Sequence, residues 1–399
     1  MSERARRRPW IWLIFIFGVM IMAFWVTTSF VDALLGESVS LAGENVLTVS
    51  LSGPVVEQPG RVFGDDPVGA LSLREIDSAL RRAADDSRIS GVVLRIGPLL
   101  SGFGKAQEIR SAVHAFRESG KPVVARLEIG SLLDLYVASA ADTIVQIPSG
   151  NYLLGLSSRR QYYRELFDTV GVEFEAFHTG PYKTAMSAYT ASEMSEEERE
   201  AIEVLLDDLY EQLVSGIAED RGLEPDAVRH AIDLGLLSAA EAAELELVDV
   251  LGFDDAVDDL VGAGQRVSVR TYNAASSSTW ALGRPAIALV HVDGMIVPGN
   301  PAPGFLGSGT LAGGDRIAAA LRAARSNSNV RAVVVRVDSP GGAVTGSDVI
   351  WREVERTAAE LPVIISMSDV AASGGYWIAM AGTPESSPCR ERTPARSVS

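Results

Sequence analysis

The strongest constraint on this chain is an internal repeat whose two copies differ at one position where chemistry could occur. Segment 122–139 returns at 362–379, and aligning the tyrosine of each copy places Leu133 opposite Ser373. The copies lie about 240 residues apart, which is far longer than a solenoid repeat and is typical of domain duplication. A serine in one copy and a leucine in the other predict that the second copy performs chemistry and the first supports it.

The repeat extends upstream and defines the expected domains. Three further pairs of segments match: 53–56 with 294–297, 80–84 with 321–325, and 91–98 with 332–339. We therefore expect a first, degenerate domain over 45–262, a linker over 273–285 and a second domain over 286–382. The second copy would have to reach roughly residue 500 to be equally long, so it is predicted to be incomplete. The tail 383–399 has no apolar period, is expected to be disordered, and indicates a frame change or a truncation.

Length, charge and cysteine usage exclude some classes of protein. The 399 residues are enough for two domains with sizeable cores. The formal net charge of −17 argues against a nucleic-acid partner, because phosphates favour basic surfaces. The single cysteine, Cys389, excludes an intramolecular disulfide, so the fold must rely on its own core.

The N-terminal segment predicts a membrane anchor. Residues 10–31 carry no charge and are long enough to cross a lipid bilayer as one helix. Arginines dominate the basic segment 1–9, so the positive-inside rule places the N-terminus in the cytoplasm and the remainder of this single-pass protein outside it. The alternative is a cleaved signal peptide. We favour the anchor, because the apolar stretch is longer than a usual signal core and no small-x-small site directly follows it.

Short β-branched runs alternate with helical patterns, which predicts an α/β fold with right-handed crossovers. Several runs are continuously apolar, as expected of parallel strands buried on both faces. The expected strands are 46–51, 91–96, 122–127, 143–147, 266–272, 286–292, 332–337 and 362–366. The expected helices are 72–85, 105–119, 134–141, 157–170, 195–221, 225–233, 313–326, 344–360 and 374–381. Ser195 and Glu198 are expected to form a capping box at the start of the long acidic helix.

Ser373 is the first candidate for chemistry. It follows an expected strand and precedes two glycines and an expected helix. A serine at such a turn projects its hydroxyl, and the helix N-terminus favours developing negative charge. The alternative is that Ser373 is an ordinary N-cap, which is a common role of serine.

A second glycine pair strengthens this interpretation. Gly341 and Gly342 follow the expected strand 332–337, where their backbone N–H groups could form an oxyanion hole. The first copy has leucines here, so it lacks both the glycine pair and the serine. This joint difference favours catalysis over simple capping at Ser373.

A nucleophilic serine needs a general base. Of the four histidines, His291 lies in an apolar strand, while His114 and His230 lie in helices without a partner motif. His178 lies close to a better candidate, Lys183, which is one of only three lysines in the chain. Burial lowers the pKa of a lysine enough for it to act as a base, which an arginine cannot match. The alternative is a surface lysine in a loop.

In combination and in order, these motifs resemble those of the signal peptide peptidase A (SppA) family, peptidase family S49, in its double-length, membrane-anchored form. The resemblance spans roughly residues 45–382 of this chain and implies tandem domains of the Clp protease and crotonase type. The matching segments are Gly180-Pro-Tyr-Lys-Thr-Ala, Met194-Ser-Glu-Glu-Glu-Arg-Glu, Asp338-Ser-Pro-Gly-Gly and Ala371-Ala-Ser-Gly-Gly-Tyr-Trp-Ile.

The resemblance also implies roles for individual residues. Ser373 becomes the nucleophile, Lys183 the general base, and Gly341 and Gly342 the region of the oxyanion hole. The implied protein is a membrane-anchored serine endopeptidase that degrades cleaved signal peptides or other membrane-derived peptides, works as a homo-oligomer and uses no cofactor or metal.

Two other functions compete with this interpretation. A crotonase-like acyl-CoA enzyme would share the fold, but such an enzyme would not be exported. An inactive truncated product, or a non-catalytic membrane scaffold of the same fold, fits the incomplete second copy.

Overall fold

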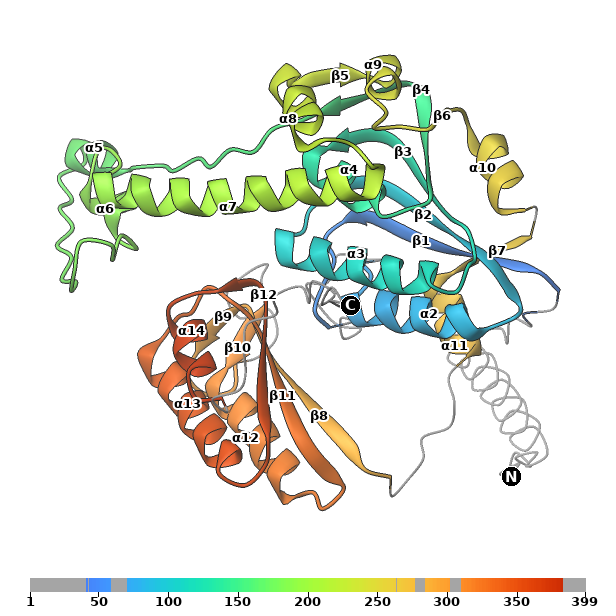
Figure 1. Ribbon diagram of the computed structural model, residues 1–399. Helices are drawn as coiled ribbons and strands as arrows, with labels where there is room; N and C mark the ends of the chain where they lie inside the picture. The colour runs from blue at the N-terminus through green and yellow to red at the C-terminus, as the bar shows by residue number, and fades with distance from the viewer. Residues whose placement is uncertain are drawn as a thin grey trace, which may run out of the picture.

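The computed structural model describes residues 41, 43–58, 70–262, 264–276, 284–301 and 310–382. The expected anchor 10–31, the tail 383–399 and residues 277–283 of the expected linker lie outside these described residues. Among the helices of the described ranges, none combines the length and the apolar character needed to span a bilayer. Two units can be followed in Figure 1, and we call residues 45–276 the first unit and residues 286–382 the second unit.

The first unit is built around a seven-stranded, mostly parallel sheet in the order β5-β4-β3-β2-β1-β7, with β6 paired to β4. Its strands are β1 (Asn45–Gly53), β2 (Ile89–Leu99), β3 (Val123–Ser131), β4 (Thr143–Leu153), β5 (Leu236–Ser238), β6 (Val250–Leu251) and β7 (Gln265–Ser268). β5 runs antiparallel to β4, and the other pairs are parallel. The mixed α/β architecture agrees with the alternation of patterns in the sequence.

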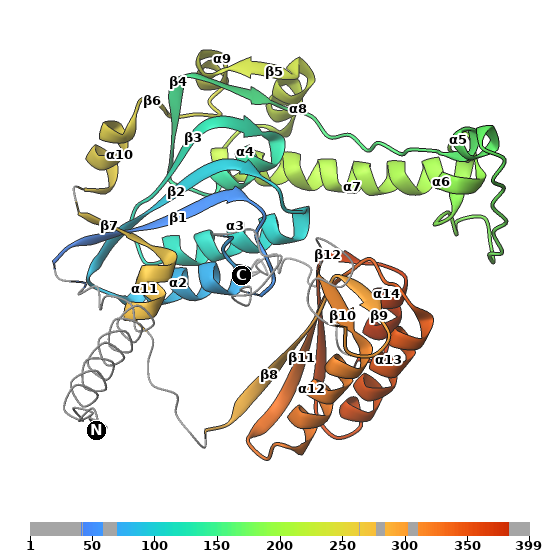
Figure 2. The ribbon, with the colours of Figure 1, turned by 180° about the vertical axis from the view of Figure 1, so that it is seen from behind.

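Helices cover both faces of this sheet, which explains its continuously apolar strands. Helices α2 (Leu73–Asp85), α3 (Phe103–Arg117) and α4 (Leu132–Ser139) pack on one face against side chains such as Leu47, Leu94 and Leu127. On the other face, α10 (Asp254–Val261) packs Val257 and Val261 onto the valines of the four central strands. Figures 1 and 2 show α2 and α3 on one side of the sheet and α10 beside it.

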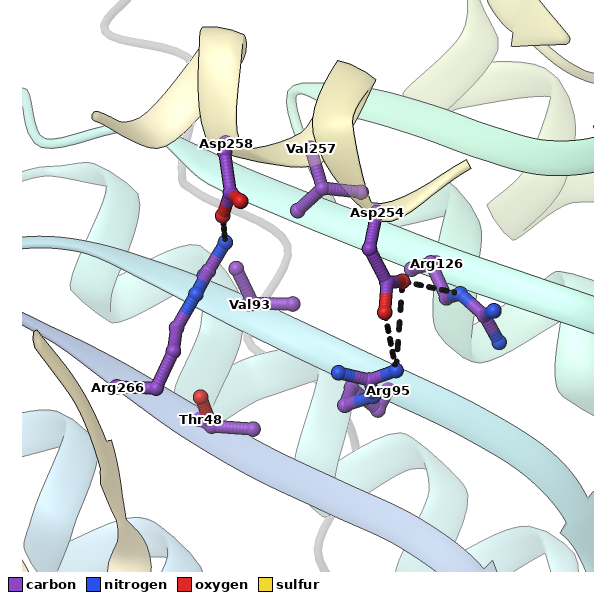
Figure 3. Close-up of a pocket in the computed structure, with 8 residues that line it drawn as sticks. All are labelled: Thr48, Val93, Arg95, Arg126, Asp254, Val257, Asp258 and Arg266. Carbon is purple, nitrogen blue, oxygen red and sulfur yellow. Dashed lines mark hydrogen bonds and ion pairs between the residues drawn. The ribbon is translucent and has the colours of Figure 1, made fainter. Parts of the chain in front are cut away.

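A cavity of about 170 Å³ lies between α10 and the sheet, and Figure 3 shows its lining. Arg95 and Arg126 both donate to Asp254, and Arg266 pairs with Asp258. The lining residues belong to β1, β2, β3, β7 and α10. This cavity is therefore a feature of the first unit alone and contains neither Ser373 nor Lys183.

The long helix α7 (Glu196–Arg221) projects beyond the first sheet, and Figures 1 and 2 both show α5 (Arg164–Thr169) and α6 (Ser187–Thr190) at its far end. Ser195 caps α7 by accepting from the backbone N–H of Glu198 at 3.1 Å. The reciprocal bond from the backbone N–H of Ser195 to the Glu198 side chain is absent, so only one of the two bonds of the predicted capping box forms. The Glu198 carboxylate is instead occupied by Arg160 and Tyr162.

Two local predictions in the first unit were wrong. The expected helix 157–170 is only the short α5, because the residues before it run as irregular chain. The expected strand 266–272 ends with β7 at Ser268, whose hydroxyl accepts from the backbone N–H of Thr271 and starts α11 (Val269–Ala275). Of the remaining helices, α8 (Pro225–Leu234) packs on α7, and α9 (Ala239–Glu244) packs beside β4 and β5.

The second unit repeats the order of the first three strands and helices on a smaller scale. Parallel strands β8 (Ala286–Asp293), β11 (Val330–Ser339) and β12 (Val363–Ala371) form a sheet in the order β12-β11-β8. Its other elements are β9 (Met295–Val297), β10 (Leu311–Gly313), α12 (Gly314–Ser326), α13 (Val344–Ala358) and α14 (Gly374–Ala379). The helices bury one face of the sheet, whereas Ile287 and Ile364 on the other face stay 67% and 51% exposed.

Candidate active site

Ser373 occupies a sharp turn between β12 and α14. Its backbone has φ 49° and ψ −117°, and the only other described non-glycine residue with positive φ is Glu246. Residues are held in such sparsely populated conformations only where the surrounding structure fixes them, and these places are enriched in functional sites. A strained serine between a strand and a helix is also the geometry of a nucleophile elbow.

The side chain of Ser373 is free for chemistry. It makes no cap bond to α14, so the alternative of an ordinary N-cap serine is wrong. The residue is exposed, while its successors Gly374 and Gly375 are buried. Its carbonyl accepts from the backbone N–H of Trp377 at 2.9 Å, which ties the turn to the helix. The hydroxyl therefore stands at the surface above a fixed backbone.

The glycine pair after β11 lies against this turn. Gly341 has φ 94°, and a Cβ built on it would lie 2.8 Å from the Cβ of Ser373. Gly342 packs equally closely on β9, where a Cβ would lie 2.1 Å from the carbonyl oxygen of Ile296. The backbone N–H of Ala372 donates to the carbonyl of Ser339 at 3.0 Å. Only glycine fits both positions, because a side chain would push the two loops apart.

The backbone donors of the two loops are not equally available. The N–H of Gly341 donates to the hydroxyl of Ser339 at 3.1 Å, and this hydroxyl donates to the carbonyl of Gly294 at 2.7 Å. Among the described residues, no acceptor takes the N–H of Gly342 or that of Gly374. These two unpaired donors belong to the two loops that meet at Ser373, and a developing negative charge within their reach would find them without a competing acceptor.

Lys183 is not brought to Ser373 within this chain. It lies between α5 and α6, at the end of α7 that projects away from both sheets in Figures 1 and 2. The residue is exposed, and its described surroundings give it no hydrogen bond or ion pair. The apolar side chains beside it are also exposed, Tyr182 at 58% and Met186 at 42%, so they do not bury the lysine. The ring of His178 bonds the carbonyl of Gly180 at 3.0 Å.

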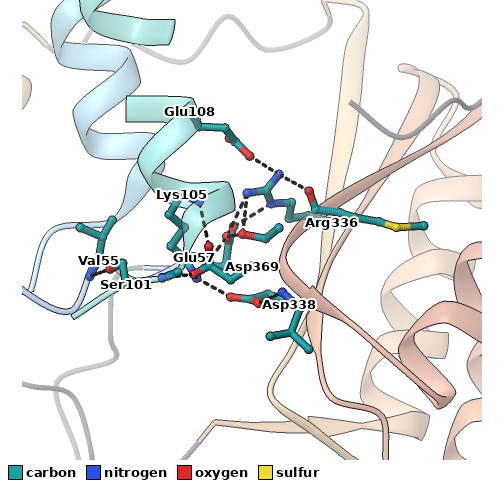
Figure 4. A network of polar contacts seen from close by, with 12 residues as sticks. Val55, Glu57, Ser101, Lys105, Glu108, Arg336, Asp338 and Asp369 are labelled. Atoms are coloured by element: carbon teal, nitrogen blue, oxygen red, sulfur yellow. Dashed lines mark hydrogen bonds and ion pairs between the residues drawn. The ribbon is translucent and has the colours of Figure 1, made fainter. Parts of the chain in front are cut away.

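A second lysine, which the sequence reasoning did not consider, lies much closer to the serine turn. Lys105 of α3 is 5% exposed, and its ammonium group donates to Asp369 at 2.8 Å and to Asp338. Both aspartates belong to the second unit, Asp338 in β11 and Asp369 in β12 (Figure 4). The rarity of lysine in this chain was the one signal that could have drawn attention to it.

Further charges complete this contact between the units. Arg336 of β11 donates to the Glu57 carboxylate through two bonds of 3.0 Å and pairs with Glu108 at 2.6 Å. Burial alone would raise the pKa of Glu57, but hydrogen bonds from Arg336 and Ser368 outweigh it and hold the pKa below its usual value. The first unit thus contributes one lysine and two glutamates, and the second one arginine and two aspartates, to a shared cluster.

The cluster keeps Lys105 charged. Burial would lower the pKa of Lys105, but hydrogen bonds to Asp338 and Asp369 outweigh it and raise the pKa. An ammonium held in this way cannot take a proton from serine, so Lys105 is unsuited to be the base. Nearby, burial and the charge of Asp338 raise the pKa of Asp293 to about 6.

The carboxylate of Asp369 has a second role at the same contact. It accepts from the backbone N–H of Gly102 at 2.9 Å and from that of Lys105 at 2.8 Å. Gly102 is the N-cap of α3 and has no side chain to cap the helix itself. An aspartate of the second unit therefore caps a helix of the first, where a negative charge is also favoured by the helix dipole.

Within the described ranges, no three histidine, cysteine, aspartate or glutamate side chains are grouped so that they could hold a metal ion.

Comparisons with known proteins place this geometry in context. Residues 115–267 match the family model described as Peptidase family S49. The chain is 33% identical to "Serine protease SPPA, chloroplastic" of Arabidopsis thaliana, over 84% of this chain and 51% of that protein. It is 33% identical to "Protease 4" of Salmonella typhi over 86% of this chain and 59% of that protein, and 30% identical to "Protease 4" of Haemophilus influenzae over 86% and 60%. The chain spans between half and three fifths of the length of these relatives.

Proposed function

Because this chain belongs to the SppA-type proteases of peptidase family S49, we propose that it is a serine endopeptidase with Ser373 as its nucleophile. Its substrates are cleaved signal peptides or other membrane-derived peptides. The observation that carries the proposal is the strained, uncapped and exposed serine beside two unpaired backbone amides. A serine that served only packing would relax into a cap or be buried.

The proposed reaction follows from these groups. The Ser373 Oγ attacks the carbonyl carbon of the scissile peptide bond, and its proton passes to the neutral amine of Lys183. The carbonyl oxygen becomes an oxyanion that accepts from the N–H groups of Gly342 and Gly374. The C–N bond then breaks, the leaving amine takes the proton from the lysine, and water hydrolyses the acyl-serine ester by the same route. Gly341 supports this oxyanion hole by its position, since its own N–H is occupied by Ser339.

The base must come to the serine from elsewhere. We propose that the protein is a homo-oligomer in which the α5–α6 end of one copy reaches the serine turn of another. Exposed apolar side chains at this end support an interface there: Leu166, Val170, Phe177, Tyr182 and Met186. Phe177 is 93% exposed, which is costly unless a partner covers it. Mixing inactive Ser373→Ala and Lys183→Ala chains tests this route, because activity returns on mixing only if the two residues pair between chains.

The finer features of the protein belong to the same proposal. Residues 10–31 anchor it in the cell membrane with the catalytic part outside the cytoplasm, and the two units are tandem domains of the Clp protease and crotonase type. The uncharged length of 10–31 and the repeated strand order of the units support these statements. Alkaline carbonate extraction tests the anchor, because release into the soluble fraction would contradict it.

Hydrolysis of a fluorogenic peptide tests the function directly. Ser373→Ala should abolish turnover while the Tm stays nearly unchanged, because alanine keeps the Cβ beside Gly341 and the lost hydroxyl makes no cap bond. Ser131→Ala in the matching loop of the first unit serves as the control and should keep full turnover. The competing proposal, an inactive or scaffolding product, is favoured by the separation of Lys183 from Ser373, and an unmodified chain without turnover would support it.

A further inference from the structure

We propose that Lys105 is a positioning residue that holds the serine turn of the second unit in its strained conformation. This inference rests on the proposed function of Ser373. Lys105 lies in the first unit, so the proposal gives that unit a specific role, which is to clamp the nucleophile of the other unit from behind.

The contacts show how the clamp would work. The serine turn has two arms, the end of β11 with Asp338 and the end of β12 with Asp369. The ammonium group of Lys105 bonds both aspartates, and Asp338 also accepts from the backbone N–H of Val370 at 3.1 Å. One buried cation therefore bridges the two arms only a few residues before Ser373 on one of them.

The backbone of α3 reinforces the same contact. A Cβ built on Gly102 would lie 2.5 Å from the Cγ of Asp369, and one built on Gly104 would lie 2.9 Å from the backbone carbon of Ser368. The start of α3 thus approaches β12 more closely than side chains allow. This approach aims the N–H groups of Gly102 and Lys105 at Asp369, so that one carboxylate is fixed by both the start of the helix and the lysine side chain.

The strain at Ser373 explains why a clamp is needed. A residue with positive φ persists there only if its surroundings exclude the relaxed alternatives. Within the second unit, the turn is held by backbone bonds from Ala372 to Ser339 and from Trp377 to Ser373. The bond from Lys105 adds a restraint from outside the unit. A lysine suits this role because its compact ammonium can donate to several carboxylates at once.

Removal of Lys105 should loosen the turn selectively. Lys105→Met leaves the two partly buried carboxylates without their cation. If this chain fails to fold, the milder variant Asp369→Asn takes its place. Asp369→Asn keeps the shape and one acceptor but weakens both the lysine bond and the cap. Lys105→Arg keeps the charge and should recover part of the effect. Lys121→Met is the matched control, because Lys121 also lies in the first unit but its ammonium group donates to the carbonyls of Ala83 and Asp86 in the same unit.

Hydrogen exchange and probe acylation on the full chain form the test. In Lys105→Met and Asp369→Asn, the amides of 369–377 should exchange at least about 10-fold faster, with β8 and the first sheet unchanged. The maximal rate of acylation by a fluorophosphonate should fall about 100-fold without a change in probe affinity, because a misplaced nucleophile loses rate rather than binding. Lys121→Met should change neither quantity.

The outcomes separate this proposal from the proposed function. Unchanged exchange at 369–377 in both variants would overturn the positioning role, whatever happens to acylation. Uniformly faster exchange across both units would also overturn it, because it would show a general structural role. If Ser373→Ala reacts with the probe as fast as the unmodified chain, the proposed function fails, while the exchange measurement still decides whether Lys105 holds the turn.

Discussion

The two units carry the same strand–turn–helix element in opposite states. In the first unit, Ser131 has a relaxed backbone, with φ −92° and ψ 176°, and forms a full capping box with Asp134 at the start of α4. In the second unit, the helix starts at the strained Ser373, whose side chain caps nothing. Tyr136 aligns with Tyr376, so Asp134 lies where the second unit has Gly374.

This difference extends to the backbone donors of the neighbouring loop. The buried Asp134 carboxylate accepts from the N–H of Leu99 at 2.9 Å, as well as from Ser131. In the first unit, the backbone N–H of Leu99 at the end of β2 is thus paired with the carboxylate of Asp134. In the second unit, the N–H groups of Gly342 and Gly374 remain unpaired among the described residues. The turn of the first unit has a relaxed, capped serine, whereas the turn of the second unit, where catalysis is proposed, has a strained and uncapped one. Such departures from local sequence–structure preferences are expected at functional sites.

The largest expected effect is the loss of Ser373 acylation when Lys183, the proposed general base, is replaced. Lys183→Arg and Lys183→Ala should both lower acylation of Ser373 by about 1,000-fold, because a general base must be neutral and arginine stays charged. His178→Ala is the control and should stay within about 2-fold of the unmodified chain, since its ring only bonds a local carbonyl. Probe acylation kinetics measure this. A Lys183→Arg chain at full rate would show that another residue activates the serine.

The capped turn of the first unit should contribute strongly to the stability of the chain. Asp134→Ala removes its bonds to Leu99 and Ser131 and should lower the free energy of unfolding by about 2–4 kcal/mol. Asp77→Ala, which loses an exposed ion pair with Arg81, should cost well under about 1 kcal/mol. Urea unfolding midpoints compare the two. Equal effects of both variants would mean that the carboxylate of Asp134 does not secure its turn.

Glycine should have opposite effects at the two aligned positions. Ser373→Gly should stabilise the chain by about 1 kcal/mol, because glycine adopts the positive φ without strain. Leu133→Gly should destabilise it, since this residue lies within α4 and packs on the core. Thermal unfolding of both variants shows whether each substitution raises or lowers the Tm. A loss of stability in Ser373→Gly would mean that the turn is not strained.

The smallest expected effect is the pH dependence contributed by Asp293 at the end of β8. Its pKa is raised to about 6, first by burial and then by Asp338, so folding favours the neutral form. The stability it contributes is full below the unfolded pKa near 4 and is lost as pH rises through about 6. Over this range, the Tm of the unmodified chain should therefore fall relative to that of Asp293→Asn. A constant difference between the two melting curves would contradict the raised pKa. The aligned position in the first unit is Ser52, which has no charge to titrate.

Much of this arrangement could be predicted from the sequence, because it depends on local patterns. Continuous apolar runs indicated the strands, and the carboxyl ends of adjacent parallel strands had to bring Gly341 close to Ser373. The strain at Ser373 could not be predicted, since a serine before a helix is usually a relaxed cap. The clamp at Lys105 was missed because it joins residues more than 230 positions apart across two units.

The position of Lys183 is the clearest limit of the sequence reasoning. A lysine base was expected to be buried, but Lys183 and the apolar residues beside it lie exposed at the end of a projecting helix. A pattern of apolar residues shows that a surface should be covered, but not which chain covers it. The same limit applies to Ile287 and Ile364, whose counterparts in the first sheet, Val46 and Val124, are buried under α10.

The central claim is that the second turn, and not the first, carries the nucleophile. Labelling the full chain with a fluorophosphonate, followed by peptide mapping in a mass spectrometer, tests it most directly. We expect one adduct, on Ser373, which disappears in Ser373→Ala and persists in Ser131→Ala. An adduct on any other serine, or persistent labelling of the Ser373→Ala chain, would contradict it.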